Sequence, residues 1–257
     1  MKKFQFKNID LRKKTVAFTW DDNFESHYKI IAPIFMDFDL RCTFYINPGE
    51  EEFNEKHFNG YKQISELGFE IGSHGYTHHH FSKLTQENFI YQLSESNKCI
   101  QALLSTTPST FAFPHHDFTI DMLELTKKVY FETRNTLTNS KRFSLKSNTD
   151  PQSITEVLTD LHNNKYDLIF SGHGVYVKTL NISECGYEPI SIRTLVKILE
   201  IISSCSNIQV CTFEQACLKS YISVNCNYTI DYCFLTDDDL LFLQQFGLTK
   251  ERIMQII

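Results

Sequence analysis

The sequence predicts an α/β fold in which parallel strands form a sheet or a barrel. Short runs of β-branched and aromatic residues recur along the chain, and helical stretches separate them. Five residues of interest follow these runs, at the carboxyl ends where parallel folds carry their functional loops; they are Asp21, Asp22, His74, Pro114 and His173. A chain of 257 residues is long enough for one such domain.

Seven strands and two long helices are expected. The strands are residues 15–20, 42–46, 69–73, 110–113, 130–134, 168–171 and 208–212. The clearest helix begins after Thr85, a residue type that caps helices, and it carries one apolar face formed by Phe89, Leu93, Ile100 and Leu104. A second helix is expected over residues 191–202.

The last part of the chain changes character, so we expect residues 1–220 to form the main domain and residues 221–257 a short helical extension. Thr236 before three aspartates indicates a capped helix start, and Gly247 indicates a helix end. The apolar residues of the extension need a partner, and both a helical hairpin packed on the main domain and a dimer contact provide one. The sequence leaves the oligomeric state open.

Charge and cysteine content narrow the classes of function. The net charge is −6 and no stripe of Lys and Arg is present, which argues against nucleic acid and anionic lipid as partners. Charged residues interrupt every apolar run before Val16, so neither a secretory signal nor a membrane span is predicted. The eight cysteines form no Cys-x-x-Cys pair, which indicates buried free thiols and a cytoplasmic location.

Two histidines four residues apart predict a metal site. His74 and His78 follow the expected strand 69–73, and Asp21-Asp22 follows the expected strand 15–20. Two imidazoles at this spacing point the same way, and one carboxylate from another strand completes a three-ligand face. Such a face suits zinc, cobalt or nickel better than magnesium or calcium, and zinc is the first expectation. A cation there lowers the pKa of bound water and polarises a carbonyl, so that the two aspartates divide the roles of ligand and base.

Three segments occur in the order and context of a known family: Thr19-Trp20-Asp21-Asp22, Cys42-Thr43-Phe44-Tyr45-Ile46 and Leu67-Gly68-Phe69-Glu70-Ile71-Gly72-Ser73-His74. Over about residues 13–218 the chain resembles polysaccharide deacetylases, the NodB-homology family or carbohydrate esterase family 4. The resemblance implies a distorted (β/α) barrel with about seven parallel strands. It also implies a hydrolase that uses one divalent metal to remove acetyl groups from N-acetylated sugars.

Carried over to this sequence, the resemblance implies that Asp21 is the catalytic base and that Asp22, His74 and His78 are the metal ligands. The last family motif matches residues 168–173, which implies that His173 is the general acid that protonates the leaving amine. This division of roles agrees with the spacing of the two histidines and the two aspartates.

One family motif is altered, because Ala112-Phe113-Pro114-His115 stands where the family has an arginine followed by Pro-Tyr. The family arginine holds the base in position, and Arg134 at the end of the next expected strand is predicted to replace it as a catalytic residue. Pro114 and His115 are predicted to contact substrate, and an additional metal ligand is the alternative for His115.

A second departure concerns the acyl pocket. Ser171 stands where the family has an aliphatic residue that lines this pocket. We therefore expect Phe170 or Val175 to provide the apolar wall.

Together these features predict a metal-dependent deacetylase that hydrolyses the N-acetyl group of an amino sugar in an oligosaccharide, a glycolipid precursor or a polysaccharide. The altered segment 112–116 and Ser171 leave three alternatives open. These are another C–N hydrolase on the same fold, an O-acetyl esterase, and a sugar-binding homologue without catalysis.

Overall fold

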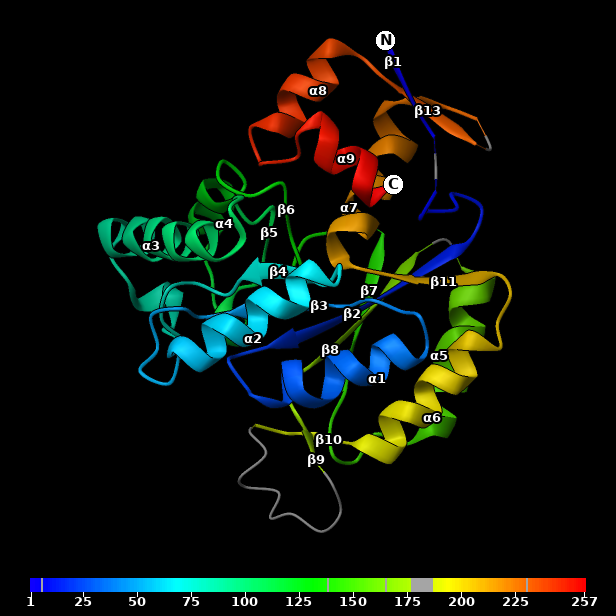
Figure 1. The fold of residues 1–257 in the computed structure, drawn as a ribbon, viewed down its shortest axis with the longest axis horizontal. Coiled ribbons are helices and arrows are strands. Elements are labelled where there is room, and N and C mark those ends of the chain that lie inside the picture. Colours follow the sequence, from blue (N-terminus) through cyan, green and yellow to red (C-terminus); the bar gives the residue numbers. More distant parts are fainter. Residues whose placement is uncertain (6, 138, 165, 177–186, 230) are drawn as a thin grey trace.

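A curled parallel sheet forms the centre of the molecule (Figure 1). The computed structural model describes residues 1–5, 7–137, 139–164, 166–176, 187–229 and 231–257. The strands of this sheet are β2 (Lys14–Asp21), β3 (Thr43–Ile46), β4 (Glu70–Ser73), β5 (Thr110–Phe111), β6 (Glu132–Thr133), β7 (Ser140–Ser144), β8 (Asp167–Gly172) and β11 (Ile208–Cys211). Seven follow one another in the order β6-β5-β4-β3-β2-β8-β7, and β11 pairs with β2. The α/β class and the distorted (β/α) barrel are therefore confirmed.

Strand β2 lies at the centre of the sheet and pairs with three other strands. One edge pairs with β8 from Val16 to Trp20, while the other edge pairs first with β11 and then with β3. All of these pairs are parallel. The carboxyl ends of neighbouring strands therefore meet at one edge, and the residues that follow β2, β4 and β8 come together there.

The side chains of β2 alternate between two environments. Phe18 and Trp20 pack in the largest apolar core, whereas Ala17 belongs to a separate cluster that contains Ile169 of β8. Alternation gives Asp21 the same direction as Ala17, toward the interior of the barrel. The side chain of Asp21 thus points into the barrel at the carboxyl end of β2.

Nine helices surround the sheet in the described part of the chain (Figure 1). They are α1 (Ala32–Asp37), α2 (Glu55–Glu66), α3 (Gln86–Leu104), α4 (Ile120–Thr126), α5 (Pro151–Asn163), α6 (Ile192–Ser203), α7 (Phe213–Asn225), α8 (Asp237–Gln244) and α9 (Lys250–Ile256). The predicted cap of α3 is present, because the Thr85 side chain accepts a hydrogen bond from the amide of Asn88. No helix among the described residues combines the length and the apolarity that crossing a membrane requires.

One strand of the main sheet was not predicted. β7 carries Lys141 and Arg142 between two serines, and its side chains are exposed or half-buried. An edge strand of this composition lacks the apolar run by which the other strands are recognised. A small parallel pair, β9 (Val175–Tyr176) and β10 (Ile190–Ser191), was missed as well because each strand is only two residues long.

The C-terminal extension contains strands as well as helices, which corrects the expectation of a purely helical segment. β13 (Tyr232–Leu235) lies between β12 (Asn227–Tyr228) and the N-terminal strand β1 (Lys2–Gln5) in an antiparallel sheet. The N-terminal strand therefore lies beside the C-terminal extension (Figure 1). Helix α7 also runs through the predicted boundary at residues 220 and 221. Sequence periodicity could not indicate this sheet, because its central strand pairs with the opposite end of the chain.

Several apolar side chains of the extension are covered within the same chain, whereas Leu241, Phe242 and Met254 are exposed. Leu243 of α8 and Ile253 of α9 are fully buried, together with Leu218 and Ile222 of α7. The amides of Lys7 and Asn8 donate hydrogen bonds to the carbonyl of Ile257 at 2.5 and 2.7 Å. This packing is the helical arrangement expected as one alternative, and the proposed dimer contact stays a prediction.

We expect Leu243→Ala to lower the free energy of unfolding of the whole domain by about 2–5 kcal/mol, because it leaves a cavity in a fully buried cluster. Leu241 on the same helix is 62% exposed, so Leu241→Ala should change stability by less than about 0.5 kcal/mol. Urea denaturation of both variants measures the difference. Equal and small effects would show that the extension is not part of the cooperative fold.

Candidate metal centre and active site

A pocket of about 600 Å³ opens where the carboxyl ends of β2, β4 and β8 meet. Seven of the residues predicted from the sequence line it: Asp21, Asp22, His74, His78, His115, Arg134 and His173. The parallel pairing of the strands brings these residues together from segments that are far apart in the chain.

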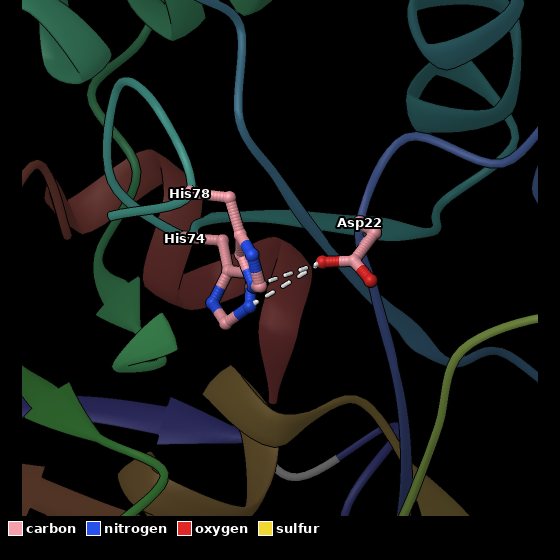
Figure 2. Close-up of side chains that lie close together, drawn as sticks. All are labelled: Asp22, His74 and His78. Carbon is pink, nitrogen blue, oxygen red and sulfur yellow. Dashed lines mark ion pairs between the residues drawn. The ribbon is translucent and has the colours of Figure 1, made fainter. Parts of the chain in front are cut away.

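Asp22, His74 and His78 form a candidate metal site (Figure 2). One ligand atom from each residue lies within 4.8 Å of the other two. Asp22 Oδ1 is 3.7 Å from His74 Nε2 and 3.3 Å from His78 Nε2. Two imidazole nitrogens and one carboxylate oxygen are a donor set that zinc, cobalt and nickel accept.

A hydrogen bond fixes the orientation of His74. Its Nδ1 lies 2.7 Å from the carbonyl oxygen of Ala112, an atom that can only accept, so Nδ1 carries the proton and Nε2 keeps its lone pair. Burial lowers the pKa of His74 to about 3 and the pKa of His78 to about 4. Both rings are therefore neutral at pH 7, as metal ligation requires.

Asp22 supports the fit of a cation at this site. Its backbone has φ of 70°, a left-handed conformation that is uncommon for residues other than glycine. Its buried Oδ1 has no hydrogen-bond partner among the described residues, and the unprotonated Nε2 of His74 faces it. Burial and the neighbouring charge of Asp21 raise the pKa of Asp22 to about 7. A cation between these acceptor atoms would give Oδ1 a partner and would favour the ionised form of Asp22.

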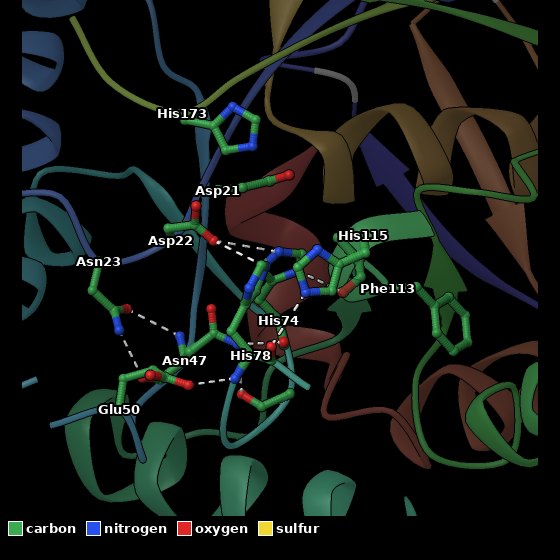
Figure 3. A network of polar contacts seen from close by, with 12 residues as sticks. Asp21, Asp22, Asn23, Asn47, Glu50, His74, His78, Phe113, His115 and His173 are labelled. Atoms are coloured by element: carbon green, nitrogen blue, oxygen red, sulfur yellow. Dashed lines mark hydrogen bonds and ion pairs between the residues drawn. The ribbon is translucent and has the colours of Figure 1, made fainter. Parts of the chain in front are cut away.

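Hydrogen bonds from neighbouring side chains stabilise the loop that carries His74 and His78 (Figure 3). The amide of His78 donates a hydrogen bond to Glu50 Oε1 at 2.5 Å, and Asn47 Nδ2 donates to the carbonyl of His74 at 2.5 Å. Asn47 in turn exchanges two hydrogen bonds with Asn23. These contacts support the ligands from outside, as is usual around metal sites.

Asp21 and Arg134 form a buried ion pair beside this site. Arg134 Nη2 donates to Asp21 Oδ2 at 2.6 Å, and Nη1 donates to both Asp21 Oδ1 and Thr19 Oγ1. Both side chains are less than 10% exposed. Burial alone would raise the pKa of Asp21, but the charge and hydrogen bonds of the Arg134 guanidinium, together with neighbouring groups, hold the pKa well below its usual range. The guanidinium of Arg134 thus contacts both carboxylate oxygens of Asp21.

His173 lies in the same pocket, half-buried, at the end of β8 (Figure 3). Its ring meets the ring of Tyr187 edge to face, with centroids 5.1 Å apart. His27 Nε2 lies 2.6 Å from the backbone carbonyl of His173 and donates to it, which fixes this turn. Burial lowers the pKa of His173, and the charge of Asp21 opposes that shift.

Two predicted walls of the acyl pocket lie elsewhere. Phe170 is fully buried and stacks on Phe18 in the helix-covered core, and Val175 also belongs to that core. The reason is alternation along β8: Ser171 lines the pocket, so Phe170 points to the other face. The described apolar residues along the pocket are Phe113, Leu145 and Tyr187, but the side chains of Phe113 and Leu145 are buried in core clusters and only Tyr187 is exposed.

The altered segment 112–116 forms a single tight turn, Pro114–His116. Pro114 is buried and does not line the pocket, while His115 does. The His115 ring packs against His78, with centroids 4.2 Å apart, and is stacked on His80. His115 is absent from the group of possible metal ligands found among the described residues.

Several pocket residues escaped the sequence reasoning, among them Arg142, Lys146, Tyr187 and Glu188. Arg142 lies on the unpredicted strand β7, and Tyr187 and Glu188 precede the unpredicted strand β10. The seven cysteines in the described residues are free thiols, and Cys185 lies outside them.

Residues 8–133 match the model of a family described as polysaccharide deacetylase. Over these residues the chain belongs to this family. The match includes Asp21, Asp22, His74 and His78 and ends before His173. This similarity supports a domain of the carbohydrate esterase and deacetylase kind.

One curated relative is the uncharacterized protein YlxY of Bacillus subtilis strain 168. It is 30% identical to this deacetylase-family chain over 107 residues, which are 41% of this chain and 33% of the relative. The matched region thus spans about a third of the relative's length.

Solved structures of the family share the fold. The chitin deacetylase of the fungus Colletotrichum lindemuthianum superposes with a TM-score of 0.60 at 15% identity, covering 83% of this chain and 89% of that one. The Xyl-CE4 domain of a xylanase from the hindgut metagenome of Trinervitermes trinervoides gives 0.57 at 15% identity, with 85% and 95% covered. A mutant CE4 pseudoenzyme of Bacillus anthracis with restored activity gives 0.56 at 16% identity, with 80% and 68% covered.

Proposed function

We propose that this protein is a metal-dependent deacetylase that hydrolyses the N-acetyl group of an amino sugar. The observation that carries the proposal is the arrangement of the pocket. The Asp21–Arg134 ion pair lies beside the Asp22, His74 and His78 cluster, and His173 lines the same cavity. A base, a ligand set and a proton donor are what amide hydrolysis with a metal needs.

In this proposal Asp22, His74 and His78 hold zinc, or cobalt or nickel in its place. When bound, the metal supplies Lewis-acid activation of the acetyl carbonyl and of a water molecule. Asp21 accepts a proton from the attacking water. Arg134 keeps Asp21 ionised and fixes both of its oxygens, so that one orientation of the carboxylate is maintained.

His173 gives a proton to the leaving nitrogen, which departs as the free amine of the sugar. The half-buried position of His173 in the pocket, across from the pair of aspartates, supports this role (Figure 3). Tyr187, an exposed aromatic residue of this pocket, offers apolar surface for the acetyl methyl group. In this proposal the wall of the acyl pocket lies on a segment other than β8.

The loss of the family arginine at Ala112 favoured a homologue without catalysis. The bidentate contact of Arg134 with Asp21 argues against that alternative, because the base keeps a guanidinium partner. An O-acetyl esterase uses the same residues in the same roles, so the substrate assay must include acetyl esters. The free thiols of the described residues support a cytoplasmic location as part of the proposal.

The function is tested by measuring acetate release from a panel of acetylated carbohydrates with the zinc-, cobalt- and nickel-loaded protein. N-acetylglucosamine oligomers, N-acetylated monosaccharide derivatives and acetylated xylan form the panel. We expect release from at least one N-acetylated member and its loss on chelation. Acetate release from acetylated xylan alone would indicate that the protein is an O-acetyl esterase and not an amidase. Binding of sugars without release from any member would favour the non-catalytic homologue.

A further inference from the structure

We propose that Arg142 forms an anion-binding subsite beside the candidate metal centre, so that the accepted sugar carries a carboxylate or a phosphate near its N-acetyl group. This inference rests on the proposed function and specifies its substrate class. Arg142 lies opposite Ile169 of β8 in the parallel register, and Ile169 belongs to the cluster inside the barrel. Arg142 therefore faces the barrel mouth, where it lines the pocket together with Asp21 and His173.

Arg142 differs from the other cations of this pocket because no carboxylate of the described residues pairs with it. Arg134 is paired with Asp21, and Lys146 Nζ is 2.9 Å from Glu188 Oε2. No Asp or Glu oxygen among the described residues lies within 4.0 Å of the Arg142 guanidinium, which is accessible to solvent. Its positive charge is thus available to a ligand. A planar guanidinium recognises carboxylate and phosphate groups through paired hydrogen bonds.

A neutral side chain holds Arg142 in place. Arg142 Nη1 donates to His116 Nδ1 at 2.8 Å, and Asn135 Nδ2 donates to the same nitrogen at 2.5 Å. Because Nδ1 accepts both bonds, the proton of the ring is on Nε2. Burial, together with the charge of Arg142, lowers the pKa of His116 to about 4, so the ring stays neutral at pH 7. The guanidinium is anchored while its charge is left uncompensated.

The backbone of the turn that carries His116 is unusual. His115 and His116 both adopt left-handed conformations, with φ of 55° and 58°. Two consecutive non-glycine residues of this kind are unfavourable and are typical of functional sites. The turn directs His116 toward Arg142 and His115 toward His78. The departure from the family motif at residues 112–116 thus coincides with the anchoring of Arg142.

Binding measurements test this subsite without requiring turnover. Isothermal titration calorimetry of the zinc-loaded protein would compare neutral N-acetylglucosamine with N-acetylglucosamine 1-phosphate and N-acetylmuramic acid. We expect at least one anionic probe to bind about ten- to a hundredfold more tightly than the neutral sugar. Arg142→Gln should remove this preference and leave the affinity for the neutral sugar unchanged. The probe that loses more affinity in Arg142→Gln shows whether the subsite prefers a phosphate or a carboxylate.

Lys141→Gln is the matched control, because it removes one positive charge from the adjacent residue of β7. Lys141 lies opposite Leu168, which is packed in the helix-covered core. The ammonium group of Lys141 pairs with Asp160. This variant should keep the preference for anions. His116→Ala should weaken the preference several-fold with an unchanged melting temperature, because the guanidinium loses its anchor.

The outcomes separate this inference from the proposed function. If neither anionic probe binds wild type more tightly than the neutral sugar, or if Arg142→Gln keeps the preference, the subsite is rejected even where acetate is released. If anion binding depends on Arg142 but no substrate is hydrolysed, the subsite stands and the deacetylase proposal falls.

Discussion

Asp21→Asn is expected to lower kcat for deacetylation by about 10²–10⁴-fold, because an amide cannot take the proton of the attacking water. Asparagine has nearly the shape of aspartate, and its oxygen can still accept one hydrogen bond from Arg134. Asp22, His74 and His78 keep their positions in this variant. Turnover should therefore fall while the metal content stays near one ion per chain. Acetate release and elemental analysis on the same preparation measure both quantities.

Two outcomes would contradict the assignment of Asp21 as the base. Turnover within a few-fold of wild type would show that another group takes the proton. Loss of metal together with activity would show that Asp21 is a ligand. Circular dichroism before and after metal loading controls for unfolding, since the variant leaves the Arg134 charge without its buried counter-ion.

Arg134→Gln is expected to destabilise the fold by about 3–5 kcal/mol, because it leaves the Asp21 carboxylate buried without its partner. The urea midpoint of unfolding measures this loss. Arg12→Gln is the matched control, since Arg12 forms its ion pair with Asp10 at the exposed surface and should matter little. In the double variant Asp21→Asn/Arg134→Gln, both charges are absent. We expect it to be more stable than Arg134→Gln alone, and additive losses would contradict the pair.

The same ion pair predicts how stability depends on pH. Arg134 holds the pKa of Asp21 in the folded state below its value in the unfolded chain. The stabilisation is therefore fully present above the unfolded pKa of about 3.9, and it is lost as the pH falls toward the folded pKa. Wild type should lose stability below about pH 4 more steeply than the double variant, which lacks the carboxylate. Parallel pH profiles of the two proteins would contradict this origin.

The sequence predicted the parallel sheet because β2, β3 and β8 are buried strands rich in β-branched, aromatic and other apolar residues. It missed β7, whose charged residues lie at the edge of the sheet, and the small sheet that joins β1 to β13. Long-range pairing between the chain ends leaves no local periodicity. Elements with their own apolar pattern were thus predictable, and elements defined by a distant partner were not.

The candidate metal site followed from local spacing, since His74 and His78 are four residues apart and Asp22 directly follows β2, which only β3 separates from β4. The position of Phe170 was predictable in principle. Ser171 and Phe170 must face opposite sides of β8, so a pocket lined by Ser171 excludes Phe170. The proposed role of Arg142 was not predictable. It depends on the edge strand β7 and on the unusual backbone of the turn Pro114–His116.

The most direct test of the central proposal is the metal content of purified wild type, Asp22→Asn and His74→Ala, measured by elemental analysis after loading with zinc and desalting. We expect about one ion per chain in wild type and far less in both variants, since each removes one of three ligands. The exposed variant His79→Ala should bind as wild type does. No bound metal in wild type, or equal metal in all four proteins, would contradict the proposed metal-dependent deacetylase.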